Sequence, residues 1–158
     1  MSDRIGLWTM TRSPEGDEVA LPLEELKTTE TEQRFEELLV ASPDVLVSGL
    51  RLIGRQVQTS VGPLDLLGVD PDGRVVLFEL KRGTLTREAV AQILDYASDL
   101  LERDQEGFAG LIENSSGRLG IDRIEDFAEW FSTEFPEVGS PELSEMRLVL
   151  VGLGVLKM

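Results

Sequence analysis

The stretch Gly62–Lys81, with the sequence GPLDLLGVDPDGRVVLFELK, decides the fold of this 158-residue chain. Its two apolar runs, Leu64–Val69 and Arg74–Leu80, flank the segment Asp70-Pro71-Asp72-Gly73. Proline in the second position and glycine in the fourth suit a type I turn that closes with a left-handed residue. The stretch therefore predicts two antiparallel strands joined by a tight hairpin turn.

The predicted turn also determines which residues face each other across the hairpin. A three-residue loop puts Asp70 opposite Arg74, and counting outward from this pair puts Asp65 opposite Glu79. Directly opposed residues have Cβ atoms about 4.5–5.5 Å apart, so the two carboxylates are expected side by side. Lys81 follows Glu79 by two residues and points to the same face of the sheet.

Two opposed carboxylates destabilise a sheet unless another group compensates their charge. A divalent cation between Asp65 and Glu79 is one solution, because carboxylate oxygens suit Mg²⁺ or Mn²⁺. Lys81, acting only as an ion-pair partner, is the other solution. The hairpin residues alone are compatible with both solutions, the cation and the Lys81 ion pair.

The remaining sequence predicts strands and helices on both sides of this hairpin. Helices are expected over 29–40 and 87–102, and a third is expected to open at Asp122-Arg123-Ile124-Glu125, an acidic relative of the capping box. Further strands are expected over 4–10, 19–23, 50–58 and 147–155, and irregular structure over 105–120. The chain ends within or just after an apolar strand, which fits either a domain of a longer protein or a buried terminal strand.

This order predicts an N-terminal β-hairpin extension over 1–28 and one domain over 29–158. The domain reads α-β-β-β-α-α-β, which is an α/β fold with a central mixed β-sheet flanked by helices. A length of 158 residues corresponds to about one domain and is long enough for a core without disulfides.

The composition excludes many kinds of site. The chain has no cysteine and no histidine, which excludes zinc fingers, cysteine nucleophiles and Ser-His-Asp triads. Acid–base or metal chemistry must therefore use carboxylates, lysine, tyrosine, amides or hydroxyls. No apolar run reaches the ~18 residues of a membrane span, and Met1-Ser2-Asp3-Arg4 does not open a signal peptide. We expect a soluble, cytoplasmic protein.

The formal net charge is −15, from 30 acidic and 15 basic residues. Phosphate binding depends on lysine and arginine, so this charge at face value argues against a polyanion as partner. The charge is unevenly distributed: residues 1–50 have 11 acids and 4 bases, 51–100 have 7 and 6, and 101–158 have 12 and 5. An anion site is therefore expected in the middle third.

The helix expected over 87–102 carries two polar residues of interest. Gln92 and Tyr96 are four residues apart and lie on one helix face. Spacing alone favours a solvated face for both residues. Thr86, just before this helix, is a plausible N-cap.

Asp65, then Glu79-x-Lys81, then Gln92-x-x-x-Tyr96 resemble the PD-(D/E)XK nuclease superfamily. The Gln-x-x-x-Tyr element is typical of its RecB-like branch. The amino-acid sequence of these motifs, and of the run Gly62–Leu67, is similar to that of endonuclease NucS-like proteins. The resemblance covers about residues 30–103 and implies a restriction-endonuclease-like core.

The resemblance implies a role for each matching residue. Asp65 and Glu79 would bind Mg²⁺ or Mn²⁺, with the Leu80 carbonyl completing the coordination. Lys81 would position or activate the attacking water and stabilise charge on the phosphate. Gln92 and Tyr96 would brace the site or touch the nucleic-acid backbone.

The family often adds a glutamate from the first helix. Glu32 and Glu36 are the candidates here, and Glu36 is preferred because it borders the apolar stripe; a solvated surface position is the alternative. Four arginines near the motif are either DNA-phosphate contacts or scattered surface residues: Arg51, Arg55, Arg82 and Arg87.

The leading hypothesis is a metal-dependent DNA endonuclease or exonuclease that hydrolyses phosphodiester bonds in DNA repair or processing. Its partner would be single-stranded, branched or mismatched DNA, and a homodimer is left open. A catalytically silent module of the same fold, binding nucleic acid or protein, is the alternative, and the charge of −15 favours it. A hydrolase of small phosphate esters is a third reading.

Overall fold

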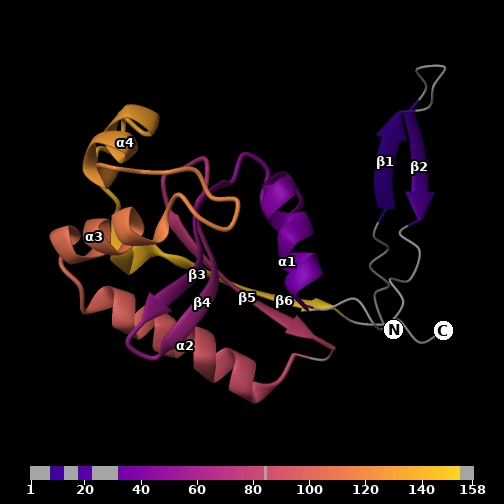
Figure 1. The fold of residues 1–158 in the computed structure, drawn as a ribbon, viewed down its shortest axis with the longest axis horizontal. Helices are drawn as coiled ribbons and strands as arrows, with labels where there is room; N and C mark the ends of the chain where they lie inside the picture. Colours follow the sequence, from indigo (N-terminus) through magenta and orange to yellow (C-terminus); the bar gives the residue numbers. More distant parts are fainter. Residues whose placement is uncertain (1–7, 13–17, 23–31, 84, 154–158) are drawn as a thin grey trace. The chain divides into compact units, whose positions relative to one another are not determined.

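The computed structural model describes residues 8–12, 18–22, 32–83 and 85–153, which form two compact units, 1–31 and 32–158 (Figure 1). In the first unit, β1 (Trp8–Arg12) pairs antiparallel with β2 (Glu18–Pro22). The predicted N-terminal β-hairpin is therefore confirmed. The predicted strand residues 4–7 and 23 lie outside the described part of the chain, as do helix residues 29–31 and strand residues 154–155.

The second unit is an α/β fold around one mixed sheet. The sheet has the strand order β3-β4-β5-β6, with antiparallel pairs at β3–β4 and β4–β5 and a parallel pair at β5–β6. This confirms the predicted α/β architecture of a central mixed sheet with flanking helices. Its elements, in order, are α1 (Glu32–Ala41), a 3₁₀ turn (Pro43–Val45), β3 (Arg51–Thr59), β4 (Gly62–Val69), β5 (Val75–Arg82), α2 (Arg87–Leu101), α3 (Gln105–Ser115), α4 (Phe127–Glu134), a second 3₁₀ turn (Leu143–Glu145) and β6 (Arg147–Leu153).

The turn between β4 and β5 has the predicted form. The Gly73 amide donates to the Asp70 carbonyl at 3.0 Å, and Gly73 has φ of +81°. Glycine adopts this left-handed conformation without the strain that a Cβ would bring. The predicted register holds from Val69 opposite Val75 to Leu66 opposite Phe78, where the paired ladder ends.

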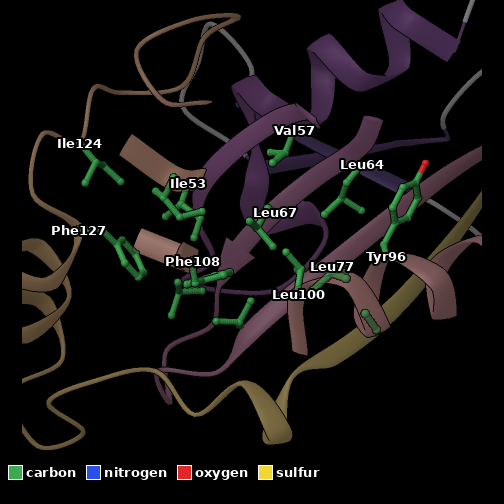
Figure 2. Close-up of a cluster of buried hydrophobic side chains, with 14 of the residues drawn as sticks. Ile53, Val57, Leu64, Leu67, Leu77, Tyr96, Leu100, Phe108, Ile124 and Phe127 are labelled. Atoms are coloured by element: carbon green, nitrogen blue, oxygen red, sulfur yellow. The ribbon is translucent and has the colours of Figure 1, made fainter. Parts of the chain in front are cut away.

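Alternating side chains of the sheet form two hydrophobic cores. The α1-side core contains Leu39, Leu50, Leu66, Val76, Phe78 and Leu80. The α2-side core lies on the opposite face, against α2, α3 and α4, and part of it is shown in Figure 2; it includes Ile53, Val57, Leu67, Leu77, Tyr96, Phe108 and Phe127. Burial of this apolar area, at about 25 cal/mol for each Å², is the main stabilising term of the fold.

Residues 105–120 are more ordered than the sequence predicts. Helix α3 occupies Gln105–Ser115, and the Asp104 side chain caps it by accepting from the Gly107 amide at 2.7 Å. The two glycines of this helix, Gly107 and Gly110, weaken its helical signal by about 1 kcal/mol each. Burial of apolar side chains in the α2-side core outweighs this propensity.

The predicted start of the next helix is wrong. Helix α4 begins at Phe127, and Asp126 caps it by accepting from the Glu129 amide at 2.9 Å. Ile124 instead lies in a loop, where its amide donates to the Ser116 hydroxyl at 2.8 Å. The order after the hairpin is therefore α-β-β-β-α-α-α-β. None of the described helices is long and apolar enough to cross a membrane.

Candidate active site

Four neighbouring elements bring polar side chains together where the β4–β5 ladder ends. Helix α1 supplies Glu36, β3 supplies Gln56, β4 supplies Asp65, and β5 supplies Glu79 and Lys81. Four of these five residues are predicted from the sequence, and the structure brings all four together. Gln56 is the residue that sequence reasoning missed.

Asp65 is held by both of its carboxylate oxygens. Oδ2 accepts the Leu80 amide at 2.7 Å, and Oδ1 accepts Nε2 of Gln56 at 3.1 Å. Burial raises the pKa of Asp65, the Leu80 hydrogen bond opposes this, and the Glu36 carboxylate raises it further. The carboxylate is therefore oriented from two sides, and it lies in a site that disfavours its negative charge.

Glu79 is the most unusual group of the site. The residue is 2% exposed, and only one of its oxygens has a clear partner: Oε1 lies 3.1 Å from Nζ of Lys81. Among the described residues, its buried Oε2 has no hydrogen-bond partner. Burial, followed by the nearby Asp65 carboxylate, raises the pKa of Glu79 to about 7 against an opposing effect of Lys81. Leaving a buried acceptor unpaired costs about 1–3 kcal/mol, so this oxygen points to a missing ligand.

Gln56 connects Asp65 to the first helix. Its Nε2 lies 3.0 Å and 3.2 Å from the two carboxylate oxygens of Glu36, besides its contact with Asp65. The backbone of Gln56 has φ of +51°, a left-handed conformation that is rare for a residue with a side chain. Such strain is typical of residues that a functional site holds in place.

The left-handed backbone also breaks the alternation of strand β3. Arg55 contacts Glu36 of α1, whereas Val57 belongs to the α2-side core, although residues two apart normally share a face. The signal for this arrangement lies in the short Ser60-Val61 turn, which pairs Thr59 with Gly62. Counting back from that pair puts Gln56 opposite Asp65.

The Glu36 carboxylate pairs with a buried arginine. Oε1 lies 2.5 Å from Nε of Arg55, and Nη1 of Arg55 donates to the Leu119 carbonyl at 3.2 Å. Arg55 is 8% exposed and Glu36 is 5% exposed. The guanidinium therefore fixes Glu36, and this environment does not fit the predicted contact of Arg55 with DNA phosphates.

Gln92 and Tyr96 of α2 form the predicted pair but not on a solvated face. The Tyr96 hydroxyl donates to the Pro63 carbonyl at 2.7 Å and accepts Nε2 of Gln92 at 2.9 Å. Tyr96 is buried beside Leu64 in the α2-side core (Figure 2), and burial raises its pKa. This geometry braces the start of β4, two residues before Asp65.

The other predicted arginines have different surroundings. Arg51 pairs with Glu134 at 2.5 Å, and Arg87 is an exposed first residue of α2. Arg82 is the last residue of β5, and its side chain lies outside the described part of the chain. The same holds for the Glu32 side chain at the start of α1.

The sequence of the chain was compared with known protein families. The model of the endonuclease NucS C-terminal domain matches residues 31–129, which is more than half of the chain. The chain belongs to the endonuclease NucS C-terminal domain family. The match includes every residue of the site, from Glu36 to Tyr96.

Relatives in the NucS family are moderately similar. Endonuclease NucS of Pyrococcus abyssi is 30% identical over 126 residues, which cover 78% of this chain and 50% of that protein. Endonuclease NucS of Pyrococcus horikoshii is 34% identical over 101 residues, which cover 64% of this chain and 40% of that protein. The chain thus spans about half the length of the curated relatives it matches.

Two solved structures also align with this NucS-family chain. One is a repair endonuclease from Pyrococcus abyssi, with a TM-score of 0.44, 23% identity, and coverage of 77% of this chain and 47% of that one. The other is an EndoMS–dsDNA2 complex, with a TM-score of 0.43, 22% identity, and coverage of 92% and 60%.

The donor atoms of the NucS-family site fit a hard divalent cation. Among the described residues no group of three or more histidine, cysteine or carboxylate side chains surrounds one point. Mg²⁺ is usually bound by one or two carboxylates together with waters and substrate phosphates. Asp65 and Glu79 supply two carboxylates, and the unpaired Oε2 of Glu79 supplies a free acceptor. The Leu80 carbonyl as a further ligand stays a prediction.

Proposed function

We propose that the chain is the nuclease domain of a metal-dependent DNA endonuclease that acts in repair. The observation that carries the proposal is the buried Glu79 carboxylate, with one oxygen unpaired, between Asp65 and Lys81. The family supports the same reaction, because its named relatives are endonucleases and one aligned structure is a repair endonuclease. A cytoplasmic location stays a prediction.

The residues of the candidate active site would have different roles in hydrolysis. Asp65 and Glu79 would hold Mg²⁺ or Mn²⁺, which when bound polarises a phosphoryl oxygen and lowers the pKa of bound water. The Leu80 amide and Gln56 keep the Asp65 carboxylate in one orientation, so little reorganisation is needed when substrate arrives.

Lys81 faces the solvent side of this pair. Its side chain is 33% exposed, and Nζ lies 3.1 Å from Oε1 of Glu79, so the ammonium reaches both the carboxylate and an incoming phosphate. There it would orient the attacking water and stabilise the charge that develops on the phosphate. Water adds to phosphorus and one bond from phosphorus to a sugar oxygen breaks, leaving a phosphate monoester and a hydroxyl group.

The net charge of −15 favours a second candidate, a catalytically silent binding module of the same fold. Hydrolysis of small phosphate esters is a third, because a small substrate avoids the acidic surface. Cleavage of labelled DNA in Mg²⁺ or Mn²⁺ separates these functions. The substrates are single-stranded, duplex, mismatched and branched DNA, and covalently closed circles separate endonuclease from exonuclease activity.

We expect wild-type cleavage of at least one DNA form, including a circular substrate, and none by the Asp65→Asn variant. Binding without cleavage in either metal would favour the silent module. Turnover of a model phosphodiester without DNA cleavage would favour the small-substrate hydrolase. A homodimer stays a prediction, which sedimentation of the chain with and without DNA tests.

A further inference from the structure

A polar groove lies beside the candidate site, between β3 and α3. Helix α3 packs against β3 (Figure 1), and the groove between them has a volume of about 530 Å³. Pockets of roughly 300–1,000 Å³ are the size that binds small molecules and cofactors. The residues that matter for its chemistry are Gln58, Arg103, Gly107, Gly110, Asn114 and Arg118.

One residue, Gln56, links the groove to the catalytic carboxylates. Nη2 of Arg118 donates to the Gln56 carbonyl at 2.9 Å, and the side chain of Gln56 bonds to Asp65. Gln58 follows Gln56 by two residues, which is about 7 Å along a strand. A polymer that crosses the candidate site therefore has this groove next to it.

Two arginines line the groove within a strongly acidic chain. Arg103 and Arg118 line it, and none of the described residues that line it is acidic. Asp99 forms an ion pair with Arg103 and accepts its Nε and Nη2 at 3.2 Å and 3.0 Å, which orients the guanidinium and offsets part of its charge. Asp99 is itself hydrogen-bonded to the Ser60 hydroxyl. Each arginine keeps further N–H groups for a ligand, because a guanidinium has five donors.

One of the two glycines of α3, Gly110, has open space beside it at the groove. A Cβ at Gly110 would meet nothing within 4 Å, so packing does not require glycine there. A glycine inside a helix is less stable than alanine by about 1 kcal/mol. Gly110 therefore destabilises the helix and is not required by packing. Its presence is explained if a ligand must approach the backbone closely at this position.

We infer that this groove binds one strand of the nucleic acid through its phosphates, next to the phosphate that the carboxylate site cleaves. The inference rests on the proposed function and adds to it the path of the strand. Arginine matches a phosphate with two parallel hydrogen bonds, and the amides of Gln58 and Asn114 suit a sugar or a base edge. The occupant is a polymer strand rather than a free nucleotide, because a single residue, Gln56, separates Arg118 of the groove from Asp65 of the catalytic site.

The matched substitutions Gly110→Glu and Gly110→Gln test the groove. Both introduce a side chain of the same size into open space, and both favour the helix more than glycine does, so thermal melting is expected to be unchanged or higher. Only glutamate adds a negative charge. The readouts are anisotropy of a labelled oligonucleotide in EDTA and cleavage in Mg²⁺.

We expect Gly110→Glu to weaken oligonucleotide binding about tenfold relative to Gly110→Gln, which is about 1.4 kcal/mol. Arg118→Gln should lower the slope of log K against log salt by about 0.7–0.9, as expected for one lost phosphate contact. Arg74→Gln is the charge-matched control. Arg74 is exposed beside the β4–β5 turn, at the far end of β4 from Asp65, and this variant should leave the slope unchanged.

Equal affinities of the two Gly110 variants would overturn the inference. It would also be overturned if deoxynucleoside monophosphate or inorganic phosphate displaced the oligonucleotide at equal concentrations, because the groove would then be a small-anion site. The proposed function fails separately, through absence of wild-type cleavage. In that case a difference in binding between the two Gly110 variants still supports a strand site in the groove.

Discussion

The substitution Glu79→Gln is expected to stabilise the protein while abolishing its activity. Glu79 is 2% exposed, and its Oε2 is unpaired among the described residues. Glutamine has nearly the same shape but no charge, so it removes the penalty of burying an ionised group. A site that binds a cation holds such a charge at the expense of stability.

The magnitude follows from the pKa of Glu79, which burial raises from 4.5 to about 7. One pH unit corresponds to about 1.4 kcal/mol, so the ionised carboxylate destabilises the folded state by up to about 3 kcal/mol above pH 8. The folded state binds this proton more tightly than the unfolded state. Its contribution to stability is therefore complete below pH 4.5 and is lost as the pH rises through 7. The raised pKa of Asp65 acts in the same direction.

The assay is urea unfolding in EDTA at pH 5 and pH 8, monitored by circular dichroism. We expect Glu79→Gln to exceed wild type by about 1–3 kcal/mol at pH 8, and the pKa of about 7 already includes the opposing effect of Lys81. At pH 5 the difference should fall to less than about 1 kcal/mol, because the folded state then keeps the proton and the unfolded state binds it in part. Mg²⁺ should stabilise wild type at pH 8 and leave the variant unchanged.

Glu125→Gln is the matched control, because Glu125 is exposed in the loop before α4 and its replacement changes the net charge equally. The control should change stability by less than about 0.5 kcal/mol at both pH values. A gain for Glu79→Gln at pH 5 as large as at pH 8 would refute the reasoning. So would a loss of stability at pH 8.

Three further substitutions separate catalysis from support. Lys81→Met should reduce cleavage by about 10²–10³-fold with an unchanged far-ultraviolet spectrum, because it removes charge stabilisation; parallel loss of the fold would contradict this. Tyr96→Phe should lower stability by about 1–2 kcal/mol in urea unfolding, because the Pro63 carbonyl loses its donor; an unchanged midpoint would argue against the brace. Gln56→Gly should be more stable than Gln56→Ala by about 1 kcal/mol, because glycine tolerates φ of +51°. Both variants lose the contact with Asp65 and should therefore cleave DNA more slowly than wild type. Equal stability of the two, or wild-type cleavage by either, would rule out a strained positioning role.

The sequence predicts the centre of the fold because local chemistry and register agree there. Asp70-Pro71-Asp72-Gly73 determines the turn, the turn determines the pairing of β4 with β5, and the pairing brings Asp65 towards Glu79. Each step is local, so it can be read without knowledge of the tertiary structure. The resemblance to a nuclease family then extends the site to Gln92 and Tyr96 in the next helix.

The parts that sequence reasoning missed depend on non-local contacts. Gln56 follows no strand periodicity, because its left-handed backbone interrupts the alternation and its partners come from α1 and β4. The sequence alone gives no sign that Arg55 is buried. In the structure its guanidinium pairs with Glu36 of α1. Helix α3 has weak propensity because of its glycines, and burial of its apolar side chains decides the outcome.

Cleavage of the DNA panel by wild type and Glu79→Gln, with and without Mg²⁺, tests the central proposal most directly. We expect Mg²⁺-dependent cleavage by wild type and none by Glu79→Gln, although the variant remains folded and is the more stable protein at pH 8. Equal cleavage by both proteins, or wild-type cleavage that persists in EDTA, would contradict catalysis at the Asp65–Glu79–Lys81 site.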